Sequence, residues 1–141
     1  MVHIDGLYGE KDSEGNDFIV REQIGTRKIS PTELELCCLP FFVYGYTLGD
    51  ILEIDHQSLA VKSIKRKSGR YLYRFMFSCG NSDVIKIADH CKDAYGALFE
   101  WYNAKHCAVD VATNELATEF CDMMRKLKSE SVLEFEDGFQ H

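Results

Sequence analysis

The chain has 141 residues and a net charge of −7, with 45% hydrophobic and 28% charged residues. This length and composition are typical of one globular domain with its own core. They exclude a transmembrane helix, because nowhere do about 18 apolar residues run together. The negative charge disfavours general nucleic-acid binding, which requires cationic groups to displace counterions.

The six cysteines are expected to be reduced thiols. The starting sequence MVHIDGLYGEKD has neither a basic n-region nor an apolar h-region, so no secretory signal is predicted. Without export, a disulfide framework is not favoured. The expected location is therefore the cytoplasm, without membrane association.

The first half of the chain predicts a loose arm followed by a β-rich part. Residues 1–16 are polar and contain several glycines, which is typical of a loose arm. Within 17–69, short apolar runs predict strands at Phe18–Ile24, Leu34–Cys38, Ile51–Ile54 and Leu59–Ile64. The aromatic stretch Phe41–Tyr46 lies among them and predicts a core plug, because aromatic side chains bury large areas. Together these segments predict a small curled sheet or partial barrel.

Residues 70–137 predict alternating strands and helices. The expected elements are a strand over 71–78, a helix over 82–95, strands over 97–102 and 107–112, a helix over 114–128 and a strand over 132–136. Gly96 is expected to end the first helix, because glycine is the usual residue just past a helix end. This order is that of a ferredoxin-like βαββαβ unit, an antiparallel sheet with two helices on one face. The predicted fold class is therefore α+β, in a single domain.

Several short segments resemble an uncharacterised bacterial family, a domain of unknown function. They are Leu39-Pro40-Phe41-Phe42, Gly49-Asp50-Ile51-Leu52, Ser68-Gly69 with Arg74, and Ala108-Val109-Asp110-Val111. The family shows a Pro-Phe segment, a Gly-Asp-Val/Ile step, a Ser-Gly-x-x-Thr-x-Arg strand start and a Val-Asp-Val strand. Leu72 departs from this pattern, which has Thr at that position. The resemblance covers about Phe18 to Asp137, and it implies a fold but no established activity.

Three polar residues within apolar segments are expected to have structural roles. Asp50 follows Gly49 in a tight turn and is expected to bond the backbone amides of that turn. Asp110 lies between two valines of a predicted strand, and it is expected to pair with Arg74 rather than to act as a catalytic acid. The basic run 65–70 is expected to be a solvated hairpin tip.

Metal and thiol chemistry have weak support in the sequence. The pairs His90-Cys91 and His106-Cys107 have residue types that bind zinc. Adjacent strand residues point to opposite faces, so His106 and Cys107 cannot easily share one metal, and both cysteines are expected to be buried apolar residues. Cys79, in a predicted turn, would need a histidine partner to act as a nucleophile. Since phosphate-binding, dinucleotide-binding and serine-nucleophile motifs are also missing, no catalytic residue, metal or cofactor is predicted.

Acidic residues gather near the C-terminal end of the sequence. They are Asp122, Glu130, Glu134, Glu136 and Asp137. The simpler interpretation is the solvation of an edge strand, and the functional one is a docking face for a basic protein. The second interpretation makes the chain a non-enzymatic protein-binding module, most concretely an immunity or antitoxin-type protein that neutralises a cationic toxin domain such as a nuclease. Two alternatives stay open: a small-ligand-binding regulatory domain, and an enzyme that uses Cys79 or a His-Cys metal site.

Overall fold

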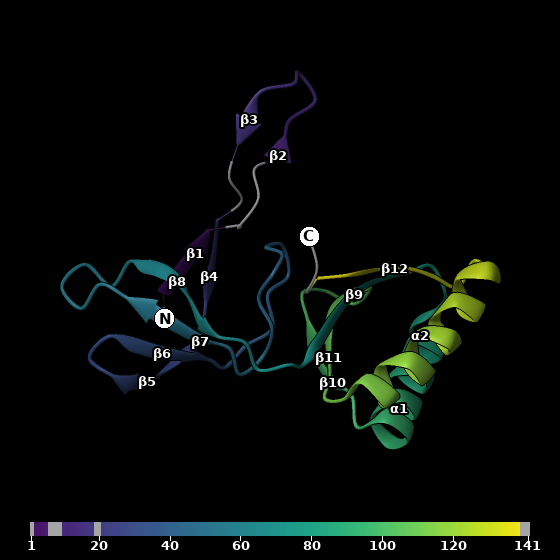
Figure 1. Ribbon diagram of the computed structural model, residues 1–141. Helices are drawn as coiled ribbons and strands as arrows, with labels where there is room; N and C mark the ends of the chain where they lie inside the picture. The colour runs from purple at the N-terminus through teal and green to yellow at the C-terminus, as the bar shows by residue number, and fades with distance from the viewer. Residues whose placement is uncertain (1, 6–9, 19–20, 139–141) are drawn as a thin grey trace. The chain divides into compact units, whose positions relative to one another are not determined.

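The computed structural model describes residues 2–5, 10–18 and 21–138, which form helices and antiparallel sheets (Figure 1). The chain divides into two compact units, Met1–Ser68 with Gly138–His141, and Gly69–Asp137. The α+β class predicted from the sequence is confirmed. Neither helix found among the described residues is long and apolar enough to cross a membrane.

The first unit is built from short strands. They are β1 (Val2–Asp5), β2 (Glu10–Lys11), β3 (Asp17–Phe18), β4 (Arg21–Ile24), β5 (Thr26–Ser30), β6 (Glu33–Leu36), β7 (Ile51–Ile54) and β8 (Val61–Arg66). β1 pairs with β4, β2 pairs with β3, and the others form a four-stranded sheet in the order β5-β6-β7-β8. All these pairs are antiparallel, an arrangement that needs only short connections between neighbours.

Alternation of side chains supplies the core of this unit. In β6, Leu34 and Leu36 are buried, while Glu33 and Glu35, which alternate with them, are partly exposed. The core consists of Val2, Ile4, Ile24, Leu34, Leu36, Val43, Tyr46, Leu52 and Ile54. At Gly25, any Cβ would lie 2.6 Å from Sγ of Cys38, so the close approach of these two segments requires glycine.

Three strands of the first unit were not predicted: β1 and the two-residue β2, both in the expected loose arm, and β5. β1 falls in the segment expected to be a loose arm, and it is ordered because Val2 and Ile4 are buried while His3 between them is exposed. The predicted arm also includes residues 1 and 6–9, which lie outside the described residues. β5 is polar and mostly exposed, so no hydrophobic alternation marks it. It is held by its ladder to β6, which includes an ion pair between Arg27 and Glu35.

The aromatic stretch 41–46 is only partly the plug that was predicted. Tyr46 is 3% exposed, and its hydroxyl donates to a backbone carbonyl of β1 at 3.2 Å, whereas Phe42 is 44% exposed. The backbone N–H groups of residues 41–43 donate to the carboxylate of Glu22 at 2.7, 3.0 and 3.2 Å. A carboxylate from β4 therefore positions this stretch together with burial, and no local sequence pattern indicates it.

The second unit combines a sheet with two helices (Figure 1). Its elements are β9 (Tyr71–Phe77), α1 (Asn81–Tyr95), β10 (Leu98–Trp101), β11 (His106–Val111), α2 (Asn114–Ser129) and β12 (Leu133–Asp137). The strand order is β10-β11-β9-β12, with every neighbouring pair antiparallel. β10 and β12 are therefore the edges of this sheet.

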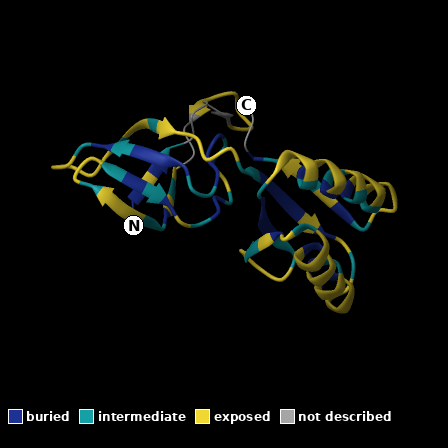
Figure 2. Ribbon diagram, turned by 60° about the horizontal axis from the view of Figure 1, so that its bottom comes forward, coloured by how far each residue is buried: buried dark blue, intermediate teal, exposed yellow. Residues whose placement is uncertain are grey.

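Aromatic packing joins the helices to one face of the sheet. Phe120 of α2 contacts Tyr73 and Phe75 of β9, with ring centroids 5.3 and 5.6 Å apart. Tyr95 of α1 packs edge-on against Phe120 at 5.8 Å. The odd-numbered residues of β9 thus face the helices, and the even-numbered ones face the opposite side. The outward faces of both helices are exposed (Figure 2).

Gly96 ends α1, as the sequence predicted. Its φ and ψ of 61° and 25° are left-handed, and its N–H donates to the Lys92 carbonyl at 3.1 Å. The N–H of Ala97 donates to the Cys91 carbonyl at 3.3 Å, which completes the usual glycine C-cap. The chain is then free to enter β10 at Leu98, so the predicted sequence of helix, strand, hairpin and strand is confirmed.

Replacing Gly96 should measure the free-energy cost of the left-handed backbone conformation for a residue that has a Cβ. A Cβ at position 96 would meet no atom within 4 Å, so Gly96→Ala is expected to lower the free energy of unfolding by about 1 kcal/mol through backbone strain only. Gly96→Asn should lose less, because asparagine adopts this conformation more readily. Urea denaturation of the two variants measures the difference, and equal losses would contradict the assignment.

Candidate functional site

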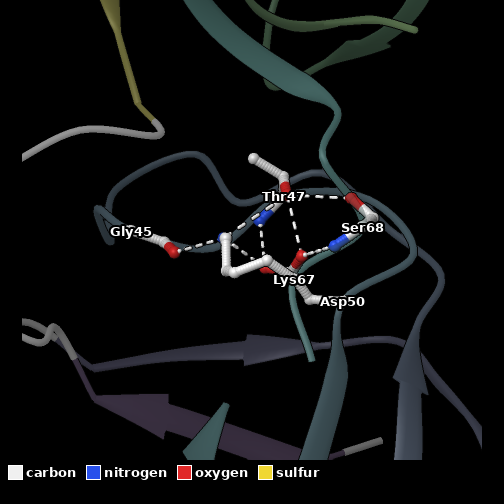
Figure 3. Close-up of polar contacts among 5 residues, drawn as sticks. All are labelled: Gly45, Thr47, Asp50, Lys67 and Ser68. Atoms are coloured by element: carbon white, nitrogen blue, oxygen red, sulfur yellow. Dashed lines mark hydrogen bonds and ion pairs between the residues drawn. The ribbon is translucent and has the colours of Figure 1, made fainter. Parts of the chain in front are cut away.

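The buried carboxylate of Asp50 is the centre of a polar network in the first unit (Figure 3). Oδ2 accepts the backbone N–H of Thr47 at 2.8 Å, and Oδ1 accepts the Thr47 hydroxyl at 2.9 Å. The backbone N–H of Ser68 donates to Oδ1 at 2.8 Å, and Nζ of Lys67 donates to Oδ2 at 2.6 Å. Gly45, Thr47, Asp50, Lys67 and Ser68 are called the Asp50 network below.

Glycine at position 49 makes room for this network. Gly49 has a left-handed φ of 81°, and a Cβ there would lie 3.3 Å from Cβ of Ser68. Nζ of Lys67 also donates to the Gly45 carbonyl at 2.7 Å, and the hydroxyls of Thr47 and Ser68 are 3.1 Å apart. The Asp50 network therefore ties the loop before β7 to the residues that follow β8.

The groups of the Asp50 network satisfy one another. The Thr47 hydroxyl donates to Asp50, so it accepts from Ser68. The hairpin tip predicted for residues 65–70 is wrong, because β8 and β9 on either side belong to different sheets, and Lys67 has a carbonyl and a carboxylate as partners. A matched set of donors and acceptors stabilises a loop. The geometry gives Asp50 the structural role expected of its turn, and it extends that role to two distant residues.

Asp110 and Arg74 do not pair with each other, contrary to the prediction. Nε of Arg70 donates to both carboxylate oxygens of Asp110 at 2.9 and 3.0 Å, and this ion pair raises the pKa of Arg70. Arg74 instead pairs with Glu136 at 3.0 Å. The register explains the exchange: Asp110 lies opposite Leu72, two residues away from Arg74 on β9.

The predicted acidic docking residues do not form one surface. Glu134 and Glu136 lie on the same face of β12, opposite Met76 and Arg74 of β9. Asp137 points to the other face of the strand. Asp122 lies on α2, where it pairs with Arg125 at 3.2 Å, and Glu130 lies just past the end of that helix. The structure therefore brings together two of the five residues.

Glu134 and Glu136 border a hollow in the face of the sheet that is turned away from the helices. Its volume is about 240 Å³, and its lining residues are Arg74, Phe75, Met76, His106, Glu134, Phe135 and Glu136; it is called the β12 hollow below. Met76 is 49% exposed there, although it lies on a central strand. The hollow combines two carboxylates with an apolar side chain. Neither Met76 nor His106 is acidic, so the charge pattern of the sequence does not group them with these glutamates, although His106 was considered as a metal ligand.

The cysteines are free thiols, and two of them are poor nucleophiles. Burial raises the pKa of Cys91 to about 11, and burial together with the nearby Cys91 raises that of Cys107 to about 12. Their histidine neighbours contact aromatic rings, His90 that of Tyr95 and His106 that of Tyr102. Over residues 2–5, 10–18 and 21–138, no group of three His, Cys, Asp or Glu side chains could hold a metal ion.

Substitution of Asp50 should be far more costly than that of an aspartate that only binds turn amides. Asp50→Ala is expected to lower the free energy of unfolding by about 3 kcal/mol or more, because it removes the acceptor of buried donors and of the Lys67 ammonium.

Asp55→Ala is the matched control for Asp50→Ala. Asp55 accepts the backbone N–H groups of Gln57 and Ser58 at 3.0 and 2.9 Å in an exposed turn, so its loss should be clearly smaller. Urea denaturation of both variants provides the comparison. Equal destabilisation would show that the Asp50 network contributes no more than an ordinary turn.

Thiol alkylation should separate the exposed cysteine from the buried pair. At about pH 8, iodoacetamide is expected to modify the exposed Cys37 in the folded protein, while Cys91 and Cys107 react only in denaturant, because they are buried and their pKa values are raised to about 11 and 12. Mass spectrometry of peptides identifies the modified residues. Modification of Cys107 in the folded state at the rate of Cys37 would contradict the assignment.

Comparisons with known proteins show a family and a fold but no activity. A family model described as "Domain of unknown function (DUF4265)" matches residues 22–135. No curated protein matches the sequence. The chain is also similar to a solved structure described as "Novel crystal structure of a hypothetical protein from Neisseria gonorrhoeae", with 12% identity and a TM-score of 0.75 over 96% of this chain and 92% of that chain. At this identity the likeness shows the fold alone.

Proposed function

Because the chain belongs to the DUF4265 family, a domain of unknown function, its own surfaces have to indicate its role, and we propose that it is a non-enzymatic protein-binding module. In its most concrete form it is a cytoplasmic immunity or antitoxin-type protein that covers a basic toxin domain. The observation that carries this proposal is the β12 hollow, where two carboxylates border an exposed methionine on the sheet face turned away from the helices.

The chemistry of the β12 hollow suits a long basic side chain. Such a side chain would lay its aliphatic stem against Met76 and its charged end between Glu134 and Glu136. Both glutamates are at least half exposed, and their present partners are Lys128 at 3.2 Å and Arg74 at 3.0 Å. The Lys128–Glu134 pair is exposed and therefore weak, so an incoming cation can compete for Glu134, whereas Glu136 also pairs with the buried guanidinium of Arg74. The net charge of −7 would speed the encounter with a cationic partner.

We propose a ferredoxin-like arrangement for the unit that carries this hollow. The order of β9, α1, β10, β11, α2 and β12 and the strand order β10-β11-β9-β12 support it. In such a unit the two helices cover one face of the sheet. The β12 hollow lies on that second face.

Binding to the purified product of the neighbouring reading frame tests the proposed function. We expect a complex that weakens as NaCl is raised, because screening reduces attraction between exposed charges. The double variant Glu134→Gln/Glu136→Gln should weaken the complex by about tenfold, mainly through slower association.

The control for this experiment removes the same amount of charge elsewhere. Glu115→Gln/Glu119→Gln neutralises two exposed carboxylates on α2 and should change the affinity by less than about twofold. Equal weakening by the two double variants would show that only net charge matters. A complex insensitive to salt, or no complex with that product, would overturn the proposal.

A further inference from the structure

The first unit contains a larger hollow whose chemistry is opposite to that of the β12 hollow. Its volume is about 630 Å³, within the range of about 300–1,000 Å³ that is typical of small-molecule sites. Val2, His3, Asp5, Arg21, Tyr46 and residues 58–63 line it, and it is called the β1–β8 hollow below. It lies apart from the groups used in the protein-binding proposal, all of which belong to the second unit.

Arg21 lines this hollow and forms a two-point ion pair with Asp5. Its Nε and Nη2 donate to the two carboxylate oxygens of Asp5 at 2.6 and 3.1 Å, and the guanidinium lowers the pKa of Asp5. A guanidinium has five N–H donors, and this pairing uses only those of Nε and Nη2. Among the described residues, the N–H groups of Nη1 therefore remain available. Asp5 therefore orients Arg21 and neutralises one charge, while further donors remain for an incoming oxyanion.

More donors line the β1–β8 hollow. Lys62 and Ser63 are exposed residues of β8, and His3 is an exposed residue of β1. The nearby carboxylate of Asp55 accepts the backbone N–H groups of Ser58 and Gln57, and these hydrogen bonds, with a smaller effect of Lys62, lower its pKa. Arg21 and Lys62 are permanent cations of the lining, and Asp5 is its one carboxylate. The carboxylate of Asp55 lies near Lys62 and offsets part of that charge, so the attraction for a negatively charged ligand is local to the guanidinium and ammonium groups.

An apolar wall completes the hollow. Leu59 was predicted to begin a strand, but it lies in the loop before β8 with a left-handed φ of 60°, and its side chain is 53% exposed. Its N–H donates to the Asp55 carbonyl at 2.7 Å, which fixes the loop. Val2 and Val61 contribute further apolar surface, and the buried ring of Tyr46 lies among the lining residues. One side of the hollow thus offers donors and the other offers apolar contact.

We propose that the β1–β8 hollow binds a small organic anion, with a phosphate or carboxylate head at Arg21, Lys62 and Ser63 and an apolar body against Leu59. A guanidinium binds phosphate and carboxylate through the same arrangement of two oxygens, so both groups suit the head of the proposed ligand. The small-ligand-binding alternative left open by the sequence is thereby assigned to a specific hollow. This proposal is independent of the protein-binding proposal.

Calorimetric titration of the whole chain tests the site. The probes are phenyl phosphate, benzoate and inorganic phosphate, each at an ionic strength held constant with NaCl. We expect saturable binding of phenyl phosphate or benzoate, and the tighter of the two identifies the head group. Inorganic phosphate should bind more weakly than phenyl phosphate, because it lacks the apolar body.

Two lysines of the same strand provide a matched pair of variants. Lys62→Ala should weaken binding by about fivefold or more, because it removes a cation from the hollow. Lys65→Ala removes the same charge from β8 at a residue that pairs with Glu33, and it should change the affinity by less than about twofold. Both lysines are exposed, so both variants should fold.

Three outcomes would overturn the proposal. Binding of none of the probes above the NaCl control would show that the hollow is not an anion site. Equal weakening by Lys62→Ala and Lys65→Ala would show unspecific attraction to the strand. Equal affinity for inorganic phosphate and phenyl phosphate would show that no apolar body binds against Leu59. The protein-binding proposal would be untouched by any of them, because its variants lie in β12 and α2.

Discussion

The first unit depends on a carboxylate that is buried and fully bonded. Burying a charged carboxylate costs several kcal/mol unless a counter-charge and hydrogen bonds replace the lost hydration. Asp50 obtains both, from the ammonium of Lys67 and from donors of Thr47 and Ser68. These donors come from the loop before β7 and from the residues after β8. The two segments are therefore fixed together, and glycine at position 49 is what lets them approach.

Other carboxylates of the first unit also accept backbone N–H groups, so part of the acidic composition of the chain has a structural role. Glu22 binds three successive amides of the aromatic stretch, and Asp55 binds the turn that presents Leu59. Acids that bind the backbone are not available to a partner. The carboxylates proposed to bind a basic protein lie on β12, and the cations proposed to bind a small anion line the β1–β8 hollow. The two proposals therefore concern different units of the chain.

The features predicted correctly from sequence are those encoded locally. Gly96 ends a helix because of its own backbone freedom, and the alternation of Tyr71–Phe77 reflects the two faces of a single strand. The turn at Gly49-Asp50 also follows from neighbouring residues. None of these needs knowledge of a distant partner.

The features that were missed depend on register between distant segments. The partner of Asp110 is Arg70, which lies 40 residues away, and the choice between Arg70 and Arg74 is a shift along one strand. In the sequence, Lys67 is one charge of a basic run that is expected to be solvated. Its partner Asp50 comes close only because β7 pairs with β8. The two hollows arise between strands that are separated in sequence, so their lining could not be predicted from composition or periodicity.

Hydrogen exchange at two amides tests most directly whether the Asp50 carboxylate holds the loop before β7 and the chain after β8 together. The N–H groups of Thr47 and Ser68 lie outside regular strands, yet both donate to Asp50 at 2.8 Å. The predicted result is that they exchange as slowly as the ladder amides of β7, because all of them open together. Exchange of either amide at the rate of an unstructured peptide would contradict this account of the unit.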